Sequence, residues 1–184
     1  SIFQSFSPLA KDKGLQFRIV PSNILVKSDP DLLERILGNF MSNAIRYTHS
    51  GSVMIGCRRR SNMVSIEVWD TGCGISDNQM PNIFEDFYQI ENKERDRSKG
   101  LGLGLALAKR LSISLNHKIV SKSKLESGSC FSVLVEIGNE NNSDDKLEIL
   151  TNVMDLSGVK VLLVEDDIDV LKSTQQLLES WGCI

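Results

Sequence analysis

The sequence predicts a two-layer α/β sandwich, in which helices cover one face of a mixed, largely antiparallel sheet. Two features of the chain indicate this fold class. Apolar residues recur at helical spacing in two long stretches, and most of the predicted strands come in pairs joined by short polar turns. Strands paired in this way are antiparallel, and such a sheet commonly packs one face against helices.

The first long helix is expected over residues 30–47. Asp29 can cap its N-terminus, and Pro30 suits the first helical position because the N–H that it lacks would have no partner there. Apolar residues then repeat at intervals of three and four. A second long helix is expected over residues 101–115, and a short helical segment over residues 77–87.

The strands are predicted from shorter apolar runs. In the first run Leu15, Phe17 and Ile19 alternate with polar residues, which is the pattern of a half-buried strand. Two later pairs of runs predict hairpins. The expected strands cover residues 15–20, 52–58, 63–69, 119–125 and 129–137.

A polar, asparagine-rich stretch follows the last hairpin and predicts a linker over residues 139–157. After it, an apolar strand is expected over residues 160–164 and a helix over residues 168–180. One strand and one helix cannot bury a core of their own. Residues 158–184 are therefore expected to be the N-terminal fragment of a second domain.

The composition excludes several classes of protein. The 184 residues carry a net charge of −3, which argues against a nucleic-acid partner. No apolar run approaches the ~20 residues that cross a bilayer, and the N-terminus lacks a signal-peptide pattern. The cysteines lie far apart and predict reduced core thiols in a cytoplasmic domain, with no zinc site. They are Cys57, Cys73, Cys130 and Cys183.

Asn39, Asn43 and Arg46 form one polar stripe on the first long helix. An amide oxygen suits Mg²⁺, which takes few protein ligands and keeps phosphates and water. Arg46, one turn further on, could reach a phosphate. The alternative is a solvated helix face with no role.

Asp70-Thr71-Gly72-Cys73-Gly74 follows a predicted strand. A carboxylate at the strand end can accept a hydrogen bond from an amino group such as that of adenine. The two glycines let the backbone pass close to a ring. The alternative is a tight turn with an exposed aspartate.

Between Lys99 and Ala106 a glycine stands at every second position, at Gly100, Gly102 and Gly104. The helix that follows directs unpaired N–H groups and its positive dipole end to this spot, which favours a phosphate. The spacing matches neither a Rossmann fingerprint nor a P-loop. Alone, the run is also compatible with a simple turn.

These three motifs stand in the order found in sensor histidine kinases, and the chain resembles that family over about residues 1–137. Residues 33–48 resemble the N box, 69–75 the G1 box, 83–89 the F box and 100–106 the G2 box. The resemblance implies a GHKL-type ATPase fold for the catalytic domain, residues 11–138. Residues 1–10 resemble the end of the connection from a dimerisation and histidine hairpin.

The resemblance also implies roles for the site residues. Asp70 is expected to hold the adenine amino group, with Tyr47 against the ring. Asn43 is expected to hold Mg²⁺ with ATP, with Asn39 beside it as a second catalytic residue, and Arg46 is expected to contact phosphate. The remaining ATP-binding residues are expected to be Gly72, Gly74, Ile75, Lys99, Gly100, Leu101, Gly102, Leu103 and Gly104.

Residues 85–99 are expected to form the ATP lid, anchored in the core by Phe84 and Phe87. Its candidate γ-phosphate contacts are Lys93, Arg95, Arg97 and Lys99. Residues 161–167 resemble the first strand of a response-regulator receiver domain, whose acidic pair, here Glu165 and Asp166, binds Mg²⁺ in the intact domain. The combination resembles a hybrid histidine kinase.

The implied activity is that of a protein-histidine kinase, which moves the γ-phosphoryl group of Mg-ATP to a histidine on a separate helical domain. His49 and His117 lack the flanking acidic residue of an acceptor, so the acceptor is expected outside this chain. The expected partners are that dimerisation and histidine domain, and a receiver domain or cognate response regulator. The full-length protein is expected to be a homodimer anchored in the inner membrane.

Two alternatives stay open. GHKL ATPases of the gyrase or chaperone type carry a glutamate, as general base, four residues before the Mg²⁺ asparagine, and this chain has Asn39 there. A non-catalytic nucleotide-binding module is the second alternative.

Overall fold

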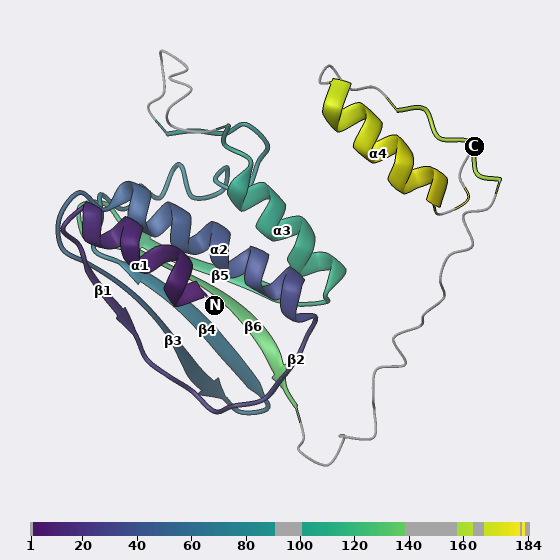
Figure 1. The fold of residues 1–184 in the computed structure, drawn as a ribbon. Coiled ribbons are helices and arrows are strands. Elements are labelled where there is room, and N and C mark those ends of the chain that lie inside the picture. The colour runs from purple at the N-terminus through teal and green to yellow at the C-terminus, as the bar shows by residue number, and fades with distance from the viewer. Residues whose placement is uncertain (1, 91–100, 139–157, 164–167, 181, 183–184) are drawn as a thin grey trace. The chain divides into compact units, whose positions relative to one another are not determined.

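The computed structural model of the chain describes residues 2–90, 101–138, 158–163, 168–180 and 182 (Figure 1). It divides into two compact units, Ser1–Asn139 and Glu140–Ile184, which are described separately below. Within the described ranges, no helix is both long enough and apolar enough to cross a membrane.

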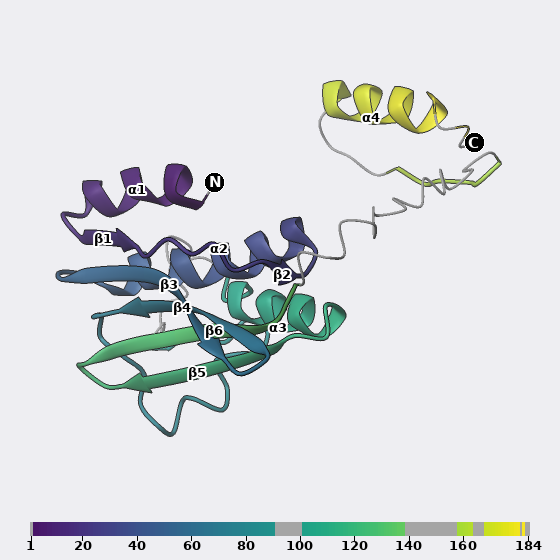
Figure 2. The same ribbon diagram turned by 90° about the horizontal axis from the view of Figure 1, so that it is seen from below.

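The first unit contains a six-stranded sheet. Strands β1, β3, β4 and β6 follow one another across it, and β5 and β2 both pair with the far edge of β6 (Figure 2). Only the β1–β3 pair is parallel, so the sheet is mixed and largely antiparallel, as predicted. The strands are β1 (Gln16–Ile19), β2 (Val26–Lys27), β3 (Ser52–Arg60), β4 (Met63–Asp70), β5 (Lys118–Lys124) and β6 (Gly128–Ile137).

Three helices form the second layer of this unit (Figure 1). Helix α2 (Pro30–Tyr47) packs on β4, and α3 (Gly104–Ser114) packs on α2 and β5. Helix α1 (Ile2–Asp12) packs on α2 and β1. The predicted two-layer α/β sandwich is confirmed.

Helix α2 is fixed at both ends by polar contacts. At the N-terminus, Oδ1 of Asp29 accepts a hydrogen bond of 2.8 Å from the N–H of Leu32. At the C-terminus, the ammonium of Lys13 donates to the carbonyl oxygens of Ile45 and Arg46, each at 2.9 Å. A cation at these carbonyls also complements the helix dipole.

The core lies between α2 and the sheet. Ile36, Phe40 and Met41 of α2 are fully buried, and the ring of Phe40 lies 5.6 Å from that of Phe131 on β6. Alternate strand residues complete this layer, since successive side chains of a strand point to opposite faces. They include Val53, Ile55, Val64, Ile66, Val68, Val133 and Val135.

The five strands predicted for this unit and the helix at residues 30–47 are confirmed within two residues at each end. The helix α4 (Ile168–Ser180) of the second unit also lies where the sequence predicts it. Two elements were not predicted: α1, which contains Pro8, and β2, which consists of two residues paired with Ile137 and Glu136.

Three predictions about local structure were wrong. Residues 77–87 form successive turns, because Pro81 has no N–H to donate within a helix. Helix α3 begins at Gly104, three residues later than expected, because Gly102 has a φ of +70°. Residues 160–163 form no strand, since the described part of that unit offers no strand to pair with.

The buried contact between α2 and β6 predicts a large effect at Phe40. We expect Phe40→Ala to lower the free energy of unfolding by about 3–5 kcal/mol, because it leaves a cavity beside Phe131. Ile113→Ala, at a side chain that is 67% exposed on α3, is the control and should change it by less than about 0.5 kcal/mol. Urea unfolding measures both, and equal values would contradict this description of the core.

Candidate functional site

The polar stripe of α2 lies beside the N-terminus of α3. Asn39 is half-buried, and its Nδ2 donates a hydrogen bond of 2.9 Å to the carbonyl of Arg35. Its Oδ1 then faces Gly104: a Cβ at Gly104 would lie 2.9 Å from that oxygen. The structure therefore brings together two of the predicted motifs.

Asn43 and Tyr47 continue the stripe toward the C-terminus of α2. The Asn43 side chain is half-buried and has no hydrogen-bond partner among the residues that the structure describes. Tyr47 is 43% exposed, and Arg46 is exposed. Asn39 and Tyr47 are eight residues apart, or about 12 Å along the helix axis.

Asp70 ends β4 and is held by backbone donors. Its Oδ1 accepts hydrogen bonds from the N–H groups of Gly72, at 2.9 Å, and Ser129, at 3.3 Å. Its Oδ2 has no partner in the described part of the chain. Burial raises the pKa of the Asp70 carboxyl above its ordinary value, and the two N–H groups act against this rise. One carboxylate oxygen thus stays available to a ligand.

The loop after Asp70 packs tightly against α2 and the β5–β6 hairpin. A Cβ at Gly72 would lie 2.4 Å from the carbonyl oxygen of Tyr47, which also accepts a hydrogen bond from the N–H of Cys73. Gly74 has a φ of +67°, and a Cβ there would lie 2.0 Å from the carbonyl oxygen of Lys124. Both positions therefore require glycine.

The same loop is joined to the β5–β6 hairpin by hydrogen bonds. The N–H of Ile75 donates to Oγ of Ser123 at 2.8 Å, and the N–H of Glu126 donates to the carbonyl of Cys73 at 2.7 Å. The hairpin thus forms one wall of the site.

No side chain of the described residues caps the N-terminus of α3. Leu103 stands at its N-cap position without a side-chain hydrogen bond, and the first turn contains no acidic residue. Unpaired N–H groups at a helix N-terminus favour an anion. Gly102, just before the cap, lies against the backbone of Tyr88, and Leu101 is 68% exposed.

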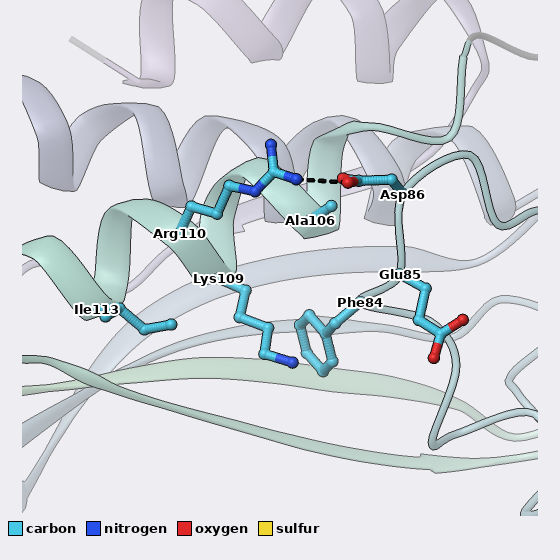
Figure 3. A pocket seen from close by; sticks show the side chains of 7 residues that line it. All are labelled: Phe84, Glu85, Asp86, Ala106, Lys109, Arg110 and Ile113. Atoms are coloured by element: carbon cyan, nitrogen blue, oxygen red, sulfur yellow. Dashed lines mark hydrogen bonds and ion pairs between the residues drawn. The ribbon is translucent and has the colours of Figure 1, made fainter.

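The start of the predicted lid, with Phe84 just before it, contacts α3 (Figure 3). The guanidinium of Arg110 forms an ion pair with Asp86, and the ammonium of Lys109 lies 6.0 Å from the ring centre of Phe84. A cavity of about 340 Å³ opens between them. Phe84 packs against the core as expected, but Phe87 is 70% exposed, so its predicted place in the core was wrong.

The prediction of core thiols was wrong for two of the cysteines. Cys57 and Cys73 are free and exposed, because the first begins the exposed last four residues of β3 and the second lies in the Asp70 loop. Cys130 is free and buried, and burial raises the pKa of its thiol to about 11. No group of three or more His, Cys, Asp or Glu side chains within the described ranges is placed to hold a metal ion.

His117 lies in the turn before β5, and its Nε2 is 2.8 Å from Oγ of Ser28. Burial lowers the pKa of its imidazole. Several residues with predicted roles lie outside the described residues: Lys93, Arg95, Arg97, Lys99, Gly100, Glu165, Asp166 and Cys183.

Two site residues were missed by the sequence analysis. Ser129 lies directly opposite Asp70 across the β4–β6 pair, and Ser123 lies opposite Ser129 on β5. A signal was available, because both hydroxyls occupy strand positions that face the helices, where the other strands carry Val and Ile.

Residues 28–139 match the family model described as "Histidine kinase-, DNA gyrase B-, and HSP90-like ATPase". The chain belongs to this ATPase family. The match includes α2, the Asp70 loop and the start of α3, so it covers the site as well as the sheet.

Similar proteins carry the names of sensor kinases. The sensor histidine kinase CusS of Escherichia coli (strain K12) is 35% identical over 49% of this chain and 19% of its own length. The autoinducer 2 sensor kinase/phosphatase LuxQ of Vibrio vulnificus (strain YJ016) is 31% identical over 88% of this chain. The chain spans about a fifth of the length of these relatives.

Among solved structures, full-length ShkA in complex with AMPPNP is similar to this chain. It has a TM-score of 0.65 and 26% identity, over 99% of this chain and 37% of its own. The catalytic domain of histidine kinase ThkA is also similar, with a TM-score of 0.62 and 21% identity over 73% of this chain and 87% of its own. The α/β fold of this ATPase domain is thus that of histidine kinase catalytic domains.

The burial of Asp70 predicts how stability depends on pH. Because the pKa of the Asp70 carboxyl is raised, the folded protein binds the carboxyl proton more tightly than the unfolded chain does. The contribution of Asp70 to the free energy of unfolding therefore falls as pH rises from about 3.8 through the folded pKa. Asp70→Asn lacks this titration. We expect the stability of the wild type relative to Asp70→Asn to decrease from below pH 3.8 to neutral pH.

Urea unfolding of both proteins across this range measures the difference. A difference that stays constant, or that increases with pH, would contradict the burial of an ionised carboxylate at this position.

Proposed function

We propose that this chain is the ATP-binding catalytic domain of a hybrid sensor histidine kinase. The domain binds Mg-ATP and donates the γ-phosphoryl group to a histidine on a separate helical domain. The observation that carries the proposal is the position of α2. Asn39 lies against Gly104 at one point of the helix, and Tyr47 lies against Gly72 at its end, so one nucleotide can span both glycine motifs.

Adenine is assigned to the Asp70 end of the site. Oδ2 of Asp70, which has no partner among the described residues, can accept a hydrogen bond from the exocyclic amino group. Gly72 and Gly74 let the loop pack closely against Tyr47 and Lys124, which fixes the Asp70 carboxylate in place. Tyr47 is exposed beside this loop and can lie against the ring. Ile75, in the same loop, completes this part of the site.

The phosphates are assigned to the N-terminus of α3. Its uncapped N–H groups, from Leu103 and Gly104 onward, suit an anion. Arg46, Lys99 and the glycines at 100 and 102 are the further phosphate contacts that we propose. AMPPNP, an analogue of ATP, occupies the similar protein ShkA.

The residues present also fit Mg²⁺. Asn43 offers an amide oxygen without a partner among the described residues, and Asn39 offers a second one turn away. Mg²⁺ bound with the triphosphate would neutralise charge on the transferring phosphoryl group. Asn43 would hold the ion, and Asn39 would orient the phosphates at the start of α3.

Phosphoryl transfer is favoured over hydrolysis because Asn39 cannot act as a general base. Its amide nitrogen is hydrogen-bonded to the helix backbone, and an amide oxygen does not take up a proton near neutral pH. A gyrase-type ATPase, with its glutamate at this position, therefore fits the site less well.

We also propose that residues 158–184 begin a receiver domain, with Glu165 and Asp166 as its Mg²⁺ ligands. The similarity to LuxQ over 88% of this chain supports this, since it extends beyond the residues that match the ATPase family. The partners would be the dimerisation and histidine domain and a receiver or response regulator. The whole protein would be a membrane-anchored homodimer with this domain in the cytoplasm.

A phosphotransfer assay tests the proposal. The chain is extended N-terminally to include the helical hairpin of its full-length protein and is incubated with γ-labelled ATP and Mg²⁺. We expect label on histidine, which is stable to base and labile to acid. Release of free phosphate without labelled protein would favour the gyrase-type alternative, and neither product would favour a non-catalytic nucleotide-binding module.

Asp70→Asn tests the adenine assignment. The N–H groups of Gly72 and Ser129 would hold the amide oxygen in the place of Oδ1, so the amide NH₂ would face the base and oppose the adenine amino group. We expect ATP affinity to fall at least about tenfold, or ~1.4 kcal/mol, in calorimetry. Asp77→Asn, at an exposed carboxylate, is the matched control and should bind as wild type.

A further inference from the structure

Ser123 makes three hydrogen bonds at the edge of the nucleotide site. Its Oγ lies 2.8 Å from the N–H nitrogen of Ile75, 3.0 Å from the carbonyl oxygen of Gly128 and 2.9 Å from Oγ of Ser129. The side chain is half-buried, on the sheet face that the helices cover. One hydroxyl thus joins the Asp70 loop to the β5–β6 hairpin.

The donors and acceptors of this cluster fix the direction of each proton. A hydroxyl has one proton to donate and two lone pairs to accept. The N–H of Ile75 can only donate to Ser123, and the carbonyl of Gly128 can only accept from it. Since Ser123 has then used its proton, Ser129 must donate in the contact between the two hydroxyls.

This direction determines what Ser129 offers to a ligand. With its proton bound by Ser123, the Ser129 oxygen has only lone pairs left to present. Asp70 lies beside it, because the backbone N–H of Ser129 donates to Oδ1 of Asp70 at 3.3 Å; Oδ2 has no partner among the described residues. Ser129, which is only 8% exposed, is paired with Asp70 across β4 and β6 on one sheet face, and the two side chains offer acceptors and no free donor.

We propose that Ser123 is a positioning residue that sets the base specificity of the site. Because Ser123 accepts the hydrogen bond from Ser129, only acceptors of Ser129 and Asp70 remain for the base. These acceptors favour a base with an exocyclic amino group over a base with a carbonyl at the same place. This inference rests on the proposed nucleotide function and deepens it. Ser123 acts through Ser129 and touches no part of the nucleotide itself.

The test compares ATP with inosine triphosphate, which carries a carbonyl in place of the amino group. In Ser123→Ala the Ser129 hydroxyl is free to turn and can donate to that carbonyl. We expect ATP affinity to fall about 2- to 12-fold, the range of one neutral hydrogen bond, while inosine triphosphate affinity stays unchanged or rises. The ratio of the two affinities, measured by calorimetry, is the readout.

Two further variants separate positioning from stability. Ser123→Thr keeps the hydroxyl and should restore the wild-type ratio. Ser121→Ala, two residues earlier on the same face of β5 and also half-buried, is the matched control and should leave the ratio unchanged. In the double variant Ser123→Ala/Ser129→Ala, the loss of discrimination between ATP and inosine triphosphate should not exceed the loss in Ser129→Ala alone.

The outcomes distinguish this inference from the proposed function. An equal loss for both nucleotides in Ser123→Ala would overturn the positioning role, because weakening the loop at Ile75 affects any base alike. An additive double variant would overturn it as well. A wild-type protein that binds neither nucleotide would instead overturn the proposed function, and this inference with it.

Discussion

The close approach of three backbone segments at the end of β4 is the constraint on which the site depends. Gly72 packs against the last carbonyl of α2, and Gly74 packs against the backbone of Lys124. A Cβ at Gly128 would lie 2.0 Å from the carbonyl oxygen of Asp70. No side chain fits at any of these points. The loop is therefore held between α2 and the hairpin. This holds one oxygen of the Asp70 carboxylate on backbone donors and leaves the other without a partner among the described residues.

Local sequence patterns predicted most of the fold, because hairpins and amphipathic helices are encoded by neighbouring residues. The failures occur where the structure is set by distant contacts. Strand β2 exists only through its pairing with Ile137 and Glu136, and α1 contains Pro8 yet buries Ala10 completely. Asn116 follows the end of α3, at a position where a glycine is common. Its φ of +54° shows that this asparagine adopts the conformation that usually requires glycine there.

The residues of the candidate site are also of two kinds: some lie in local motifs, and others are placed by contacts between distant parts of the sequence. Asn39, Asn43 and Asp70 belong to motifs that can be found in sequence, because each lies within a few residues of its glycines or its helical neighbours. Ser123 is hydrogen-bonded to Ile75, 48 residues away in the sequence, and Ser129 to Asp70, 59 residues away. Those contacts follow from the register of β5 and β4 on β6, which no single-sequence pattern reports.

Asp70, Ser129 and Ser123 form a polar row on the sheet face that packs against the helices, where most side chains are apolar. Apart from Ser121 on β5, the next rows of the same face carry apolar side chains of the core, among them Val68, Phe131 and Ile66. Burying a carboxylate and two hydroxyls there is unfavourable unless each polar atom is paired. Every one is paired with a described residue except Asp70 Oδ2 and the remaining lone pairs of Ser129, and both belong to acceptors on one wall. Within the described residues, the open positions of this row are all hydrogen-bond acceptors, which supports the proposed preference for a base with an amino group.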